Sequence, residues 1–311
     1  MAKIIVVGSL NMDLVAHTPR IPTPGETVLG SDFGTFSGGK GANQAVAAAR
    51  QGAEVAFIGR VGSDAFGQQL LAGLQAEGID TRHIGRDENA PSGVALITLD
   101  ANGQNTILVA SGANLLLKPA HLRAAEGVFV GADILLLQLE IPLETVMAAA
   151  QQAKTHGLKV ILNPAPAQSL PEDLLSLVDV LIPNESETAL LTGLPVDTVA
   201  RVEAAAQKLL EHGAGCVIIT LGERGALLVS AGQPAAPIPS FAVKVVDTTA
   251  AGDSFVGALA VALASGSSLM VAVQRGCVAG ALAATRLGAQ PSLPTKAEVD
   301  YFLLLHAPQL E

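Results

Sequence analysis

The sequence has few aromatic residues and only two cysteines. Aromatic side chains make up 3% of the 311 residues and tryptophan is absent, whereas half of the residues are hydrophobic, so the apolar content is mainly aliphatic. This composition is typical of Val-, Ile- and Leu-rich strands that are covered by Ala- and Leu-rich helices. Cys216 and Cys277 are too few for a disulfide framework or a zinc site, and they suit a reducing compartment.

The sequence also lacks a basic run and a long hydrophobic run. The lack of a basic run argues against a nucleic-acid surface, and the net charge of −10 does not exclude ATP binding, because local groups outweigh the global charge. The most apolar later stretch, residues 255–264, is about half the length of a membrane span. The apolar run at the N-terminus is too short for a signal peptide. We therefore expect a cytoplasmic protein that binds neither nucleic acid nor membrane.

Short aliphatic runs recur along the chain and are mostly bounded by Gly, Pro or Asp. They comprise residues 4–7, 55–58, 134–137, 160–162, 180–182 and 217–219. The later half is expected to be helical over 142–156, 199–212, 252–265 and 268–286. Apolar runs that alternate with helices predict an α/β fold with a mainly parallel sheet flanked by helices. Polar residues and glycines follow each run, which predicts a ligand site at the carboxyl ends of the strands.

Two segments depart from this alternation. Residues 11–36 contain three prolines and little helical periodicity, and residues 92–111 have the pattern of a hairpin that turns at Asn102-Gly103. We interpret both segments as strands of a small β lid outside the main sheet. Because no internal repeat or linker is evident, residues 1–311 are predicted to form one domain that carries this lid.

The first candidate site is a glycine-rich segment, residues 37–44, at the start of a helix. Glycines there let backbone N–H groups approach a ligand closely. The spacing resembles that of a phosphate-binding P-loop, but Gly41 stands where Ser or Thr would hold Mg²⁺, so the segment is not a P-loop. A purely structural loop is the alternative, although it would need neither Lys40 nor Asn43, both of which can bind hydroxyls.

The second candidate site is the segment 247–253, which leads into a long helix. The successive amides of Ala250, Ala251 and Gly252 are expected to form an anion hole at the helix N-terminus. Beside such a hole, the carboxylate of Asp253 can accept a proton from an alcohol while the hole stabilises a transferring phosphoryl group. The alternative is that Asp253 is an ordinary helix cap.

Several other polar residues follow strands or open helices. They comprise Asn11, Asp13, Glu140, Asn184, Glu187 and the turn 220–225. A short pair such as Asn11 and Asp13 can grip vicinal hydroxyls, and a glutamate in the crevice can hold a Mg²⁺-bound water. Turn residues and acidic helix-start residues are the structural alternative. The six histidines show no metal-ligand spacing, so zinc chemistry and hydrolase triads are poorly supported.

Taken in order, these motifs resemble those of the PfkB carbohydrate-kinase family over nearly the whole chain. The two signature segments are Gly38-Gly39-Lys40-Gly41-Ala42-Asn43-Gln44-Ala45 and Asp247-Thr248-Thr249-Ala250-Ala251-Gly252-Asp253. Further matching segments are Gly8-Ser9-Leu10-Asn11-Met12-Asp13, Gln138-Leu139-Glu140, Asn163-Pro164-Ala165-Pro166, Pro183-Asn184-Glu185, Thr220-Leu221-Gly222 and Gly288-Ala289-Gln290-Pro291-Ser292. The resemblance implies a Rossmann-like sheet and a β lid that also forms the contact of a homodimer.

The resemblance also implies a reaction, the transfer of a phosphoryl group from ATP to the primary (O5) hydroxyl of ribose. The sugar-binding residues implied are Asn11, Asp13, Gly39, Lys40, Gly41, Asn43, Glu140 and Asp253. Asp253 is implied as the catalytic base, with Ala250, Ala251 and Gly252 as the anion hole. The ATP-binding residues implied are Asn184, Thr220, Gly222, Gly225, Gly252 and Cys277. Glu187 is implied to support Mg²⁺ through water, and a K⁺ site is implied at Asp247, Thr249, Ala283, Arg286, Gly288 and Ser292.

Other functions stay open at this stage. A kinase for deoxyribose or for another pentose or ketohexose would keep nearly every motif, and Val109 in the lid is expected to affect which sugar fits. A nucleotide-linked dehydrogenase would require G-x-G-x-x-G after the first strand, which this sequence lacks. A non-catalytic sugar- or nucleotide-binding regulator is the third alternative. It would not need a base such as Asp253.

Overall fold

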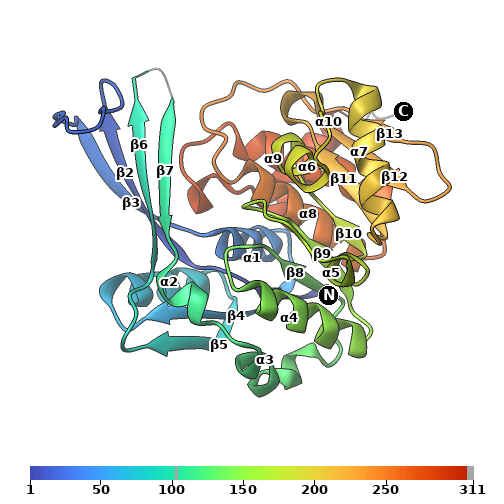
Figure 1. Ribbon diagram of the computed structural model, residues 1–311, viewed down its shortest axis with the longest axis horizontal. Helices are drawn as coiled ribbons and strands as arrows, with labels where there is room; N and C mark the ends of the chain where they lie inside the picture. The colour runs from blue at the N-terminus through green and yellow to red at the C-terminus, as the bar shows by residue number, and fades with distance from the viewer. Residues whose placement is uncertain (102–103, 307–311) are drawn as a thin grey trace.

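The main sheet has nine strands. The computed structural model describes residues 1–101 and 104–306 of the chain. Within these residues the strand order of the main sheet is β13-β12-β11-β10-β9-β8-β1-β4-β5 (Figure 1). The strand bounds are β1 Lys3–Val7, β4 Glu54–Gly62, β5 Asp80–Asp87, β8 Ile134–Leu137, β9 Lys159–Leu162, β10 Val180–Leu181, β11 Cys216–Thr220, β12 Ala226–Ser230 and β13 Ala236–Ile238. All six apolar runs predicted as strands lie in this sheet.

The sheet is parallel from β5 to β11 and antiparallel at its β12–β13 edge. The six apolar runs do not include β5, β12 or β13. β5 is an edge strand in which most side chains are partly or fully exposed, so its sequence is mostly polar and contains no continuous apolar run. The prediction of a mainly parallel sheet is confirmed, with an antiparallel edge that the sequence pattern did not reveal.

Helices cover both faces of the main sheet. Along β1, Ile4 and Val6 pack into one hydrophobic cluster and Ile5 and Val7 into the other. The first cluster takes side chains from α1 Lys40–Arg50, α2 Ala65–Ala76, α8 Ala251–Ala264, α9 Leu269–Ala283 and α10 Lys296–His306. The second takes them from α3 Pro119–Ala124, α4 Leu143–Thr155, α5 Glu172–Leu175 and α7 Val199–Glu211. The four helices predicted in the later half correspond to α4, α7, α8 and α9.

A separate sheet of four strands in the order β3-β2-β6-β7 stands apart from the main sheet (Figure 1). Its strands are β2 Asn11–Thr18, β3 Asp32–Gly38, β6 Gly93–Asp100 and β7 Asn105–Ala110. Both segments predicted to form extra strands therefore do so. β6 and β7 pair antiparallel, as expected for a hairpin. The predicted turn at Asn102-Gly103 lies outside the described residues.

The chain passes directly from the main sheet to the small sheet. β1 ends at Val7 and β2 begins at Asn11, so the first residues of β2 lie just beyond the carboxyl end of a central strand. β3 returns the chain to Gly38, next to the start of α1. The small sheet thus contributes side chains to the edge where ligands bind in open α/β sheets. No helix in the part of the chain that the structure describes is long and apolar enough to span a membrane.

Candidate active site

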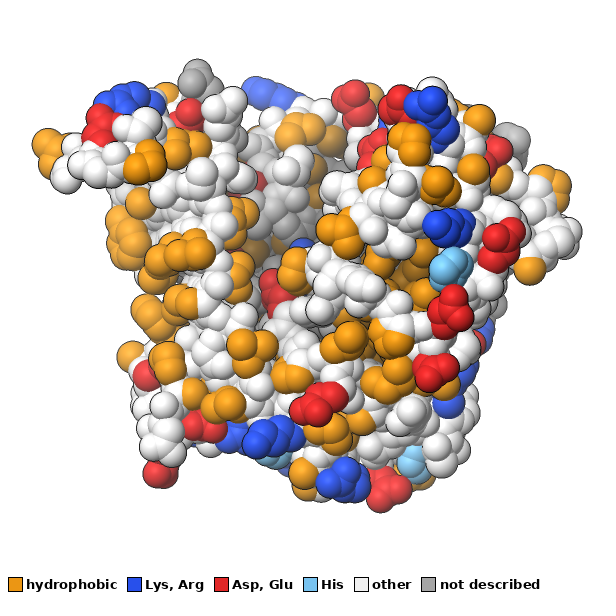
Figure 2. Space-filling view, in the orientation of Figure 1, with side chains coloured by type: hydrophobic (Ala, Val, Ile, Leu, Met, Phe, Trp, Pro, Cys, Tyr) orange, Lys and Arg blue, Asp and Glu red, His pale blue; other side chains and the backbone are white. Residues whose placement is uncertain are grey.

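A cavity of about 200 Å³ lies at the carboxyl ends of β9, β10 and β11. Figure 2 shows a hollow between the small sheet and the larger part of the molecule, with acidic side chains visible at its floor. The residues that line the cavity are Lys40, Asn163, Ala165, Ile182, Asn184, Glu187, Thr220, Thr248, Ala250, Gly252, Asp253 and Val256. The cavity therefore joins the start of α1 to the start of α8, which are the two segments predicted to carry the chemistry.

Asp253 lies in the first turn of α8 and is only 6% exposed. Two neighbouring amides of α1 hold its carboxylate: Asn43 Nδ2 donates to Oδ2 at 2.9 Å, and Gln44 Nε2 donates to Oδ1 at 3.0 Å. Burial raises the pKa of Asp253, while Lys40 and the two amide donors oppose this shift. Asp253 is thus a buried carboxylate whose charged form depends on a few specific partners.

A second carboxylate, Glu140, follows β8 and joins three segments. Its Oε2 atom accepts hydrogen bonds from Ser9 Oγ at 2.5 Å, from the backbone N–H of Lys40 at 3.0 Å and from Asn11 Nδ2 at 3.4 Å. These donors come from the β1–β2 connection, the start of α1 and the start of β2. Glu140 therefore fixes the sugar-binding residues implied by the family resemblance relative to one another.

Asp13 completes a cluster of three carboxylates. It lies in β2 and is buried. Burial, followed by the nearby charges of Glu140 and Asp253, raises the pKa of Asp13 to about 7. The ammonium group of Lys40 is attracted by Asp253, Glu140 and Glu187, which outweigh its burial and raise its pKa. The site is thus rich in acceptors and contains one central cation, a pattern suited to binding hydroxyl groups beside a phosphate.

The backbone at Gly39 allows α1 to start against β2. Gly39 has φ of 89°, in the left-handed region that favours glycine, and a Cβ atom there would lie 2.7 Å from the backbone nitrogen of Asn11. Both observations require glycine. They explain why the glycine-rich segment precedes Lys40 and Asn43. Gly34, whose spacing before Gly39-Lys40 resembles that of the first glycine of a P-loop, lies within β3, so the segment does not form such a loop.

The start of α8 differs in one respect from the predicted anion hole. The backbone N–H of Ala251 donates to the carbonyl of Thr248 at 3.1 Å. Within residues 1–101 and 104–306, the amides of Ala250, Gly252 and Asp253 donate to no other group. Ala250 has φ of 61° and is the one non-glycine residue in the left-handed region among those described. A strained turn thus leaves the backbone amides of Ala250, Gly252 and Asp253 unpaired at the start of α8.

The predicted ATP residues fall into two groups. Asn184 and Thr220 line the cavity, and Asn184 forms a reciprocal cap with Glu187 at the start of α6 Glu185–Thr192. Burial raises the pKa of Glu187. Gly222 and Gly225 flank a short turn after β11 and do not line the cavity. Cys277 lies in the hydrophobic core, where burial raises the pKa of its thiol to about 12.

The predicted cation residues gather around the carboxylate of Asp247. Its Oδ1 atom accepts from the backbone N–H and the hydroxyl of Thr249, and Oδ2 accepts from the backbone N–H of Gly288 at 2.9 Å. The other members lie nearby in sequence but are engaged elsewhere. Arg286 donates to Glu298, the carbonyl of Ala283 accepts from Arg286, and Ser292 donates to Ala289. The structure thus brings together Asp247, Thr249 and Gly288.

Sequence reasoning missed several buried or half-buried polar residues that support the site. They comprise Ser9, Gln44, Asn114, Gln138 and Asn163. Asn114 donates to Asn11 Oδ1 at 2.8 Å, which turns the amide nitrogen of Asn11 toward Glu140. No sequence pattern marks Asn114. Gln44, Gln138 and Asn163, by contrast, stand inside motifs that the sequence analysis quoted, and only their contacts were unknown.

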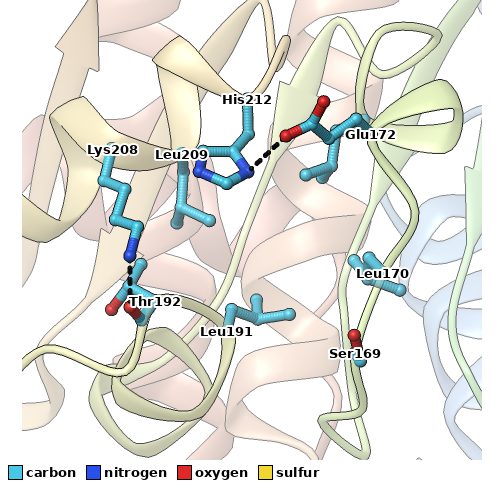
Figure 3. Close-up of a pocket in the computed structure, with 9 residues that line it drawn as sticks. Ser169, Leu170, Glu172, Leu191, Thr192, Lys208, Leu209 and His212 are labelled. Carbon is cyan, nitrogen blue, oxygen red and sulfur yellow. Dashed lines mark hydrogen bonds and ion pairs between the residues drawn. The ribbon is translucent and has the colours of Figure 1, made fainter.

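A second cavity lies away from these residues, between the loop before α5, the end of α6 and the end of α7 (Figure 3). Most of its polar side chains are already paired. Lys208 donates to the carbonyl of Thr192 at 2.8 Å, and His212 lies 3.3 Å from Glu172. It contains none of the residues predicted to act in catalysis or binding. The first cavity is therefore the candidate active site.

Comparisons with known proteins show the family to which the chain belongs. The pattern of the pfkB family of carbohydrate kinases matches residues 1–296. The chain is 44% identical over 298 residues to a ribokinase of Haemophilus influenzae, covering 96% of this chain and 97% of that protein. It is 38% identical over 304 residues to a deoxyribokinase of Salmonella typhimurium, covering 97% and 99%.

A solved structure of a related protein has the same fold. The ribokinase of Arabidopsis thaliana complexed with ribose and ATP superposes with a TM-score of 0.92 at 35% identity, covering 97% of this chain and 99% of that chain. The agreement includes both the large sheet with its helices and the small sheet. Together, the family pattern and the near full-length relatives show that the chain belongs to the pfkB family of carbohydrate kinases.

Proposed function

We propose that this protein phosphorylates D-ribose at its primary O5 hydroxyl, using ATP and forming ribose 5-phosphate and ADP. The observation that carries the proposal is the buried carboxylate of Asp253, which lies in a cavity next to Lys40 and the unpaired amides at the start of α8. A binding protein would not need this arrangement. The ribokinase relatives and the structural neighbour with ribose and ATP support ribose as the substrate.

In the proposed reaction Asp253 is the general base. Its carboxylate accepts the proton of the O5 hydroxyl as that oxygen attacks the γ-phosphorus of ATP, and the bond from phosphorus to the β–γ bridging oxygen breaks to release ADP. The amides of Ala250 and Gly252 stabilise the negative charge on the transferring group. Lys40 contributes positive charge on the same side of the cavity. The backbone N–H of Ala251, which was also predicted for the hole, already donates to the carbonyl of Thr248, so Ala251 stabilises the turn and does not bind the phosphoryl group.

The carboxylates and amides opposite α8 bind the sugar in this proposal. Asn11, Asp13, Asn43 and Glu140 are acceptors and donors placed around the start of α1, where Gly39 and Gly41 let the backbone approach the ligand. Most of these groups are buried, and a buried polar group that loses its partner costs free energy. A ligand with several adjacent hydroxyls is therefore the expected partner, and a pentose fits this description.

ATP is proposed to bind along the ends of β10 and β11. Asn184, Thr220 and Gly252 line the cavity, and Gly222 and Gly225 shape the turn that follows Thr220. The sequence also implied an adenine contact for Cys277, which the core position of this thiol does not favour.

Mg²⁺ would arrive with the phosphates of ATP. Glu187 faces the cavity, its carboxylate is partly buried, and it accepts one backbone hydrogen bond, from Asn184 at 2.8 Å. One carboxylate acting through water fits an ion that keeps several waters and is bound mainly by phosphate oxygens. When bound, Mg²⁺ would neutralise charge on the phosphates. Glu187 would orient its water shell.

We propose K⁺ as a monovalent activator next to the segment that forms the anion hole. Asp247, Thr249 and Gly288 lie together, and the implied site is completed by Ala283, Arg286 and Ser292. A carboxylate with backbone and hydroxyl oxygens is a suitable donor set for an alkali cation. Because Thr249 directly precedes Ala250, a cation bound at this site would also hold the strained turn before α8 in place.

We also propose that the small sheet is a lid and the contact of a homodimer. All six residues of β7 are exposed, including Ile107, Leu108 and Val109, and Figure 2 shows hydrophobic side chains over the small sheet. An exposed apolar edge strand is typical of a surface that binds another protein chain. The two buried free cysteines and the need for ATP fit a cytoplasmic protein.

The identity of the sugar can be tested with an ATP-consumption assay over pentoses and hexoses. We expect kcat/KM for ribose to exceed that for 2-deoxyribose by at least about tenfold, because buried acceptors left without a hydroxyl partner penalise the analogue. A preference for 2-deoxyribose would instead identify a deoxyribose kinase, as the Salmonella relative suggests. No turnover with any sugar, with Mg²⁺ and K⁺ supplied, would favour a non-catalytic regulator.

The role of Asp253 can be tested with Asp253→Asn, which keeps the shape of the side chain and removes the base. We expect kcat to fall by at least about 10²-fold, because positioned proton transfer contributes that much in similar reactions. Sugar binding measured by calorimetry should persist. The exposed carboxylate of Glu144 provides a control, since Glu144→Gln should leave kcat unchanged. Near-normal turnover in Asp253→Asn would contradict the mechanism.

The cation proposal predicts faster turnover in K⁺ than in Na⁺ at equal ionic strength. Na⁺ is smaller and fits a donor set sized for K⁺ less well. Asp247→Asn removes the side-chain charge that binds both Thr249 and Gly288, so this variant should lose the difference between the two salts. Initial rates in matched chloride buffers provide the measurement. Equal rates of the unmodified protein in both salts would refute the assignment.

The raised pKa of Asp13 predicts that replacing this residue stabilises the protein in a pH-dependent way while it weakens sugar binding. Because its pKa is raised from 3.8 to about 7, the folded state holds this proton more tightly than the unfolded chain, and stability is lost as pH rises between these values. Asp13→Asn should therefore stabilise the unliganded protein by on the order of 3 kcal/mol above neutral pH and by little in acid. Urea unfolding at several pH values measures the difference, and a gain that is independent of pH would refute this origin. Sugar affinity should fall in the same variant.

A further inference from the structure

Gln44 is completely buried beside Asp253 and is not among the residues that line the cavity. Resting on the function proposed above, we propose that Gln44, oriented by Gln138, is a positioning residue that holds the Asp253 carboxylate in its reactive orientation and in its charged form. Gln44 would act on catalysis without touching the sugar or ATP.

The contacts of Gln44 use both ends of its amide. Its Nε2 atom donates to Asp253 Oδ1 at 3.0 Å and to Asn163 Oδ1 at 3.1 Å, and its Oε1 atom accepts from Gln138 Nε2 at 2.5 Å. A flipped amide would place an oxygen against two oxygens and a nitrogen against a donor. The three neighbours therefore permit one orientation of Gln44, and in that orientation it is a donor to Asp253.

The neighbours of Gln44 are themselves held. Asn163 Nδ2 donates to the carbonyl of Ile182 at 2.8 Å, which leaves Oδ1 as the acceptor facing Gln44. Gln138 is fully buried, and its Oε1 atom has no hydrogen-bond partner among the described residues. A Cβ atom at Gly8 would lie 2.3 Å from this oxygen, so the absence of a side chain at Gly8 makes room for Gln138.

An orphaned buried acceptor is costly, and an apolar side chain of the same size would avoid that cost. Among the described residues, the side chain of Gln138 makes one polar contact, its donation to Gln44. We therefore interpret Gln138 as a residue retained for the direction it imposes on Gln44, because stability alone would favour an apolar residue at this place.

The effect on Asp253 follows from the charges around it. Asp13 from β2, Glu140 after β8 and Glu187 from α6 are acidic, and Lys40 from α1 is the one cation that faces it from these elements. The other carboxylate oxygen is held by Asn43, which is also expected to bind sugar. Gln44 is thus expected to keep its hydrogen bond to Asp253 both with and without bound sugar. Loss of this donor should make the carboxylate harder to ionise.

The test compares four variants with the unmodified protein: Gln44→Met, Gln138→Met, the double variant and Gln51→Met. Methionine keeps the length of glutamine and removes the amide. Gln51 is the matched control, since it ends the same helix, is buried, donates one hydrogen bond to the carbonyl of Pro294 at 3.0 Å and also has an unpaired Oε1. It has no contact with Asp253.

We expect Gln44→Met to lower kcat at neutral pH about tenfold and to move the acidic limb of the kcat profile upward by about one pH unit, with KM for sugar and ATP nearly unchanged. Gln138→Met should shift the profile in the same direction by less. The double variant should match Gln44→Met, because Gln138 acts through Gln44. Gln51→Met should leave the profile in place, even if its melting temperature falls as much.

Carboxyl-¹³C NMR of protein labelled at aspartate gives a readout that does not depend on turnover. The Asp253 resonance, assigned by its loss in Asp253→Asn, should titrate at higher pH in Gln44→Met than in the unmodified protein. An unchanged titration, or effects of Gln44 and Gln138 that simply add, would overturn the inference. Absence of kinase activity in the unmodified protein would instead overturn the proposed function and leave the NMR result to decide the role of Gln44.

Discussion

The candidate site depends on keeping a carboxylate charged although it is almost completely buried. Asp253 is 6% exposed, and two acidic neighbours, Asp13 and Glu140, make its ionisation less favourable. Lys40 and the amides of Asn43 and Gln44 oppose these effects. Such a balance between desolvation and specific partners is how enzymes obtain a base that is strong enough to act and still ionised near neutral pH.

The fold delivers these partners from distant parts of the chain. α1 and α8 are neighbours that pack closely through small buried residues, including Ala47, Ala48 and Gly257, so the first turns of both helices meet at one point. β1 leads into β2 and so places Asn11 and Asp13 on the opposite side of that point. The strain at Ala250 and the raised pKa of Asp13 both lower the stability of the folded protein. Such local destabilisation is common at functional sites.

The sequence predicted the parts of the fold and site that local patterns determine. Buried parallel strands require continuous apolar runs, so β1, β4, β8, β9, β10 and β11 could be located, whereas the half-exposed edge strand β5 could not. Asp253 and Lys40 were predicted because each stands in a motif at a helix start. The role of Gln44 could not be predicted, because it arises where residues 94 and 209 positions away in the chain converge on one amide. The hydrogen bond of Ala251 likewise depends on the geometry of the turn.

The central claim is that Asp253 takes the proton from a sugar hydroxyl while the start of α8 receives the phosphoryl group. A crystal structure of the protein with ribose and a non-hydrolysable ATP analogue would test it most directly. The account predicts that the O5 hydroxyl lies within about 2.6–3.2 Å of an Asp253 carboxylate oxygen, with the γ-phosphate facing the amides of Ala250 and Gly252. A bound sugar whose O5 points away from Asp253, or a γ-phosphate held elsewhere, would contradict it.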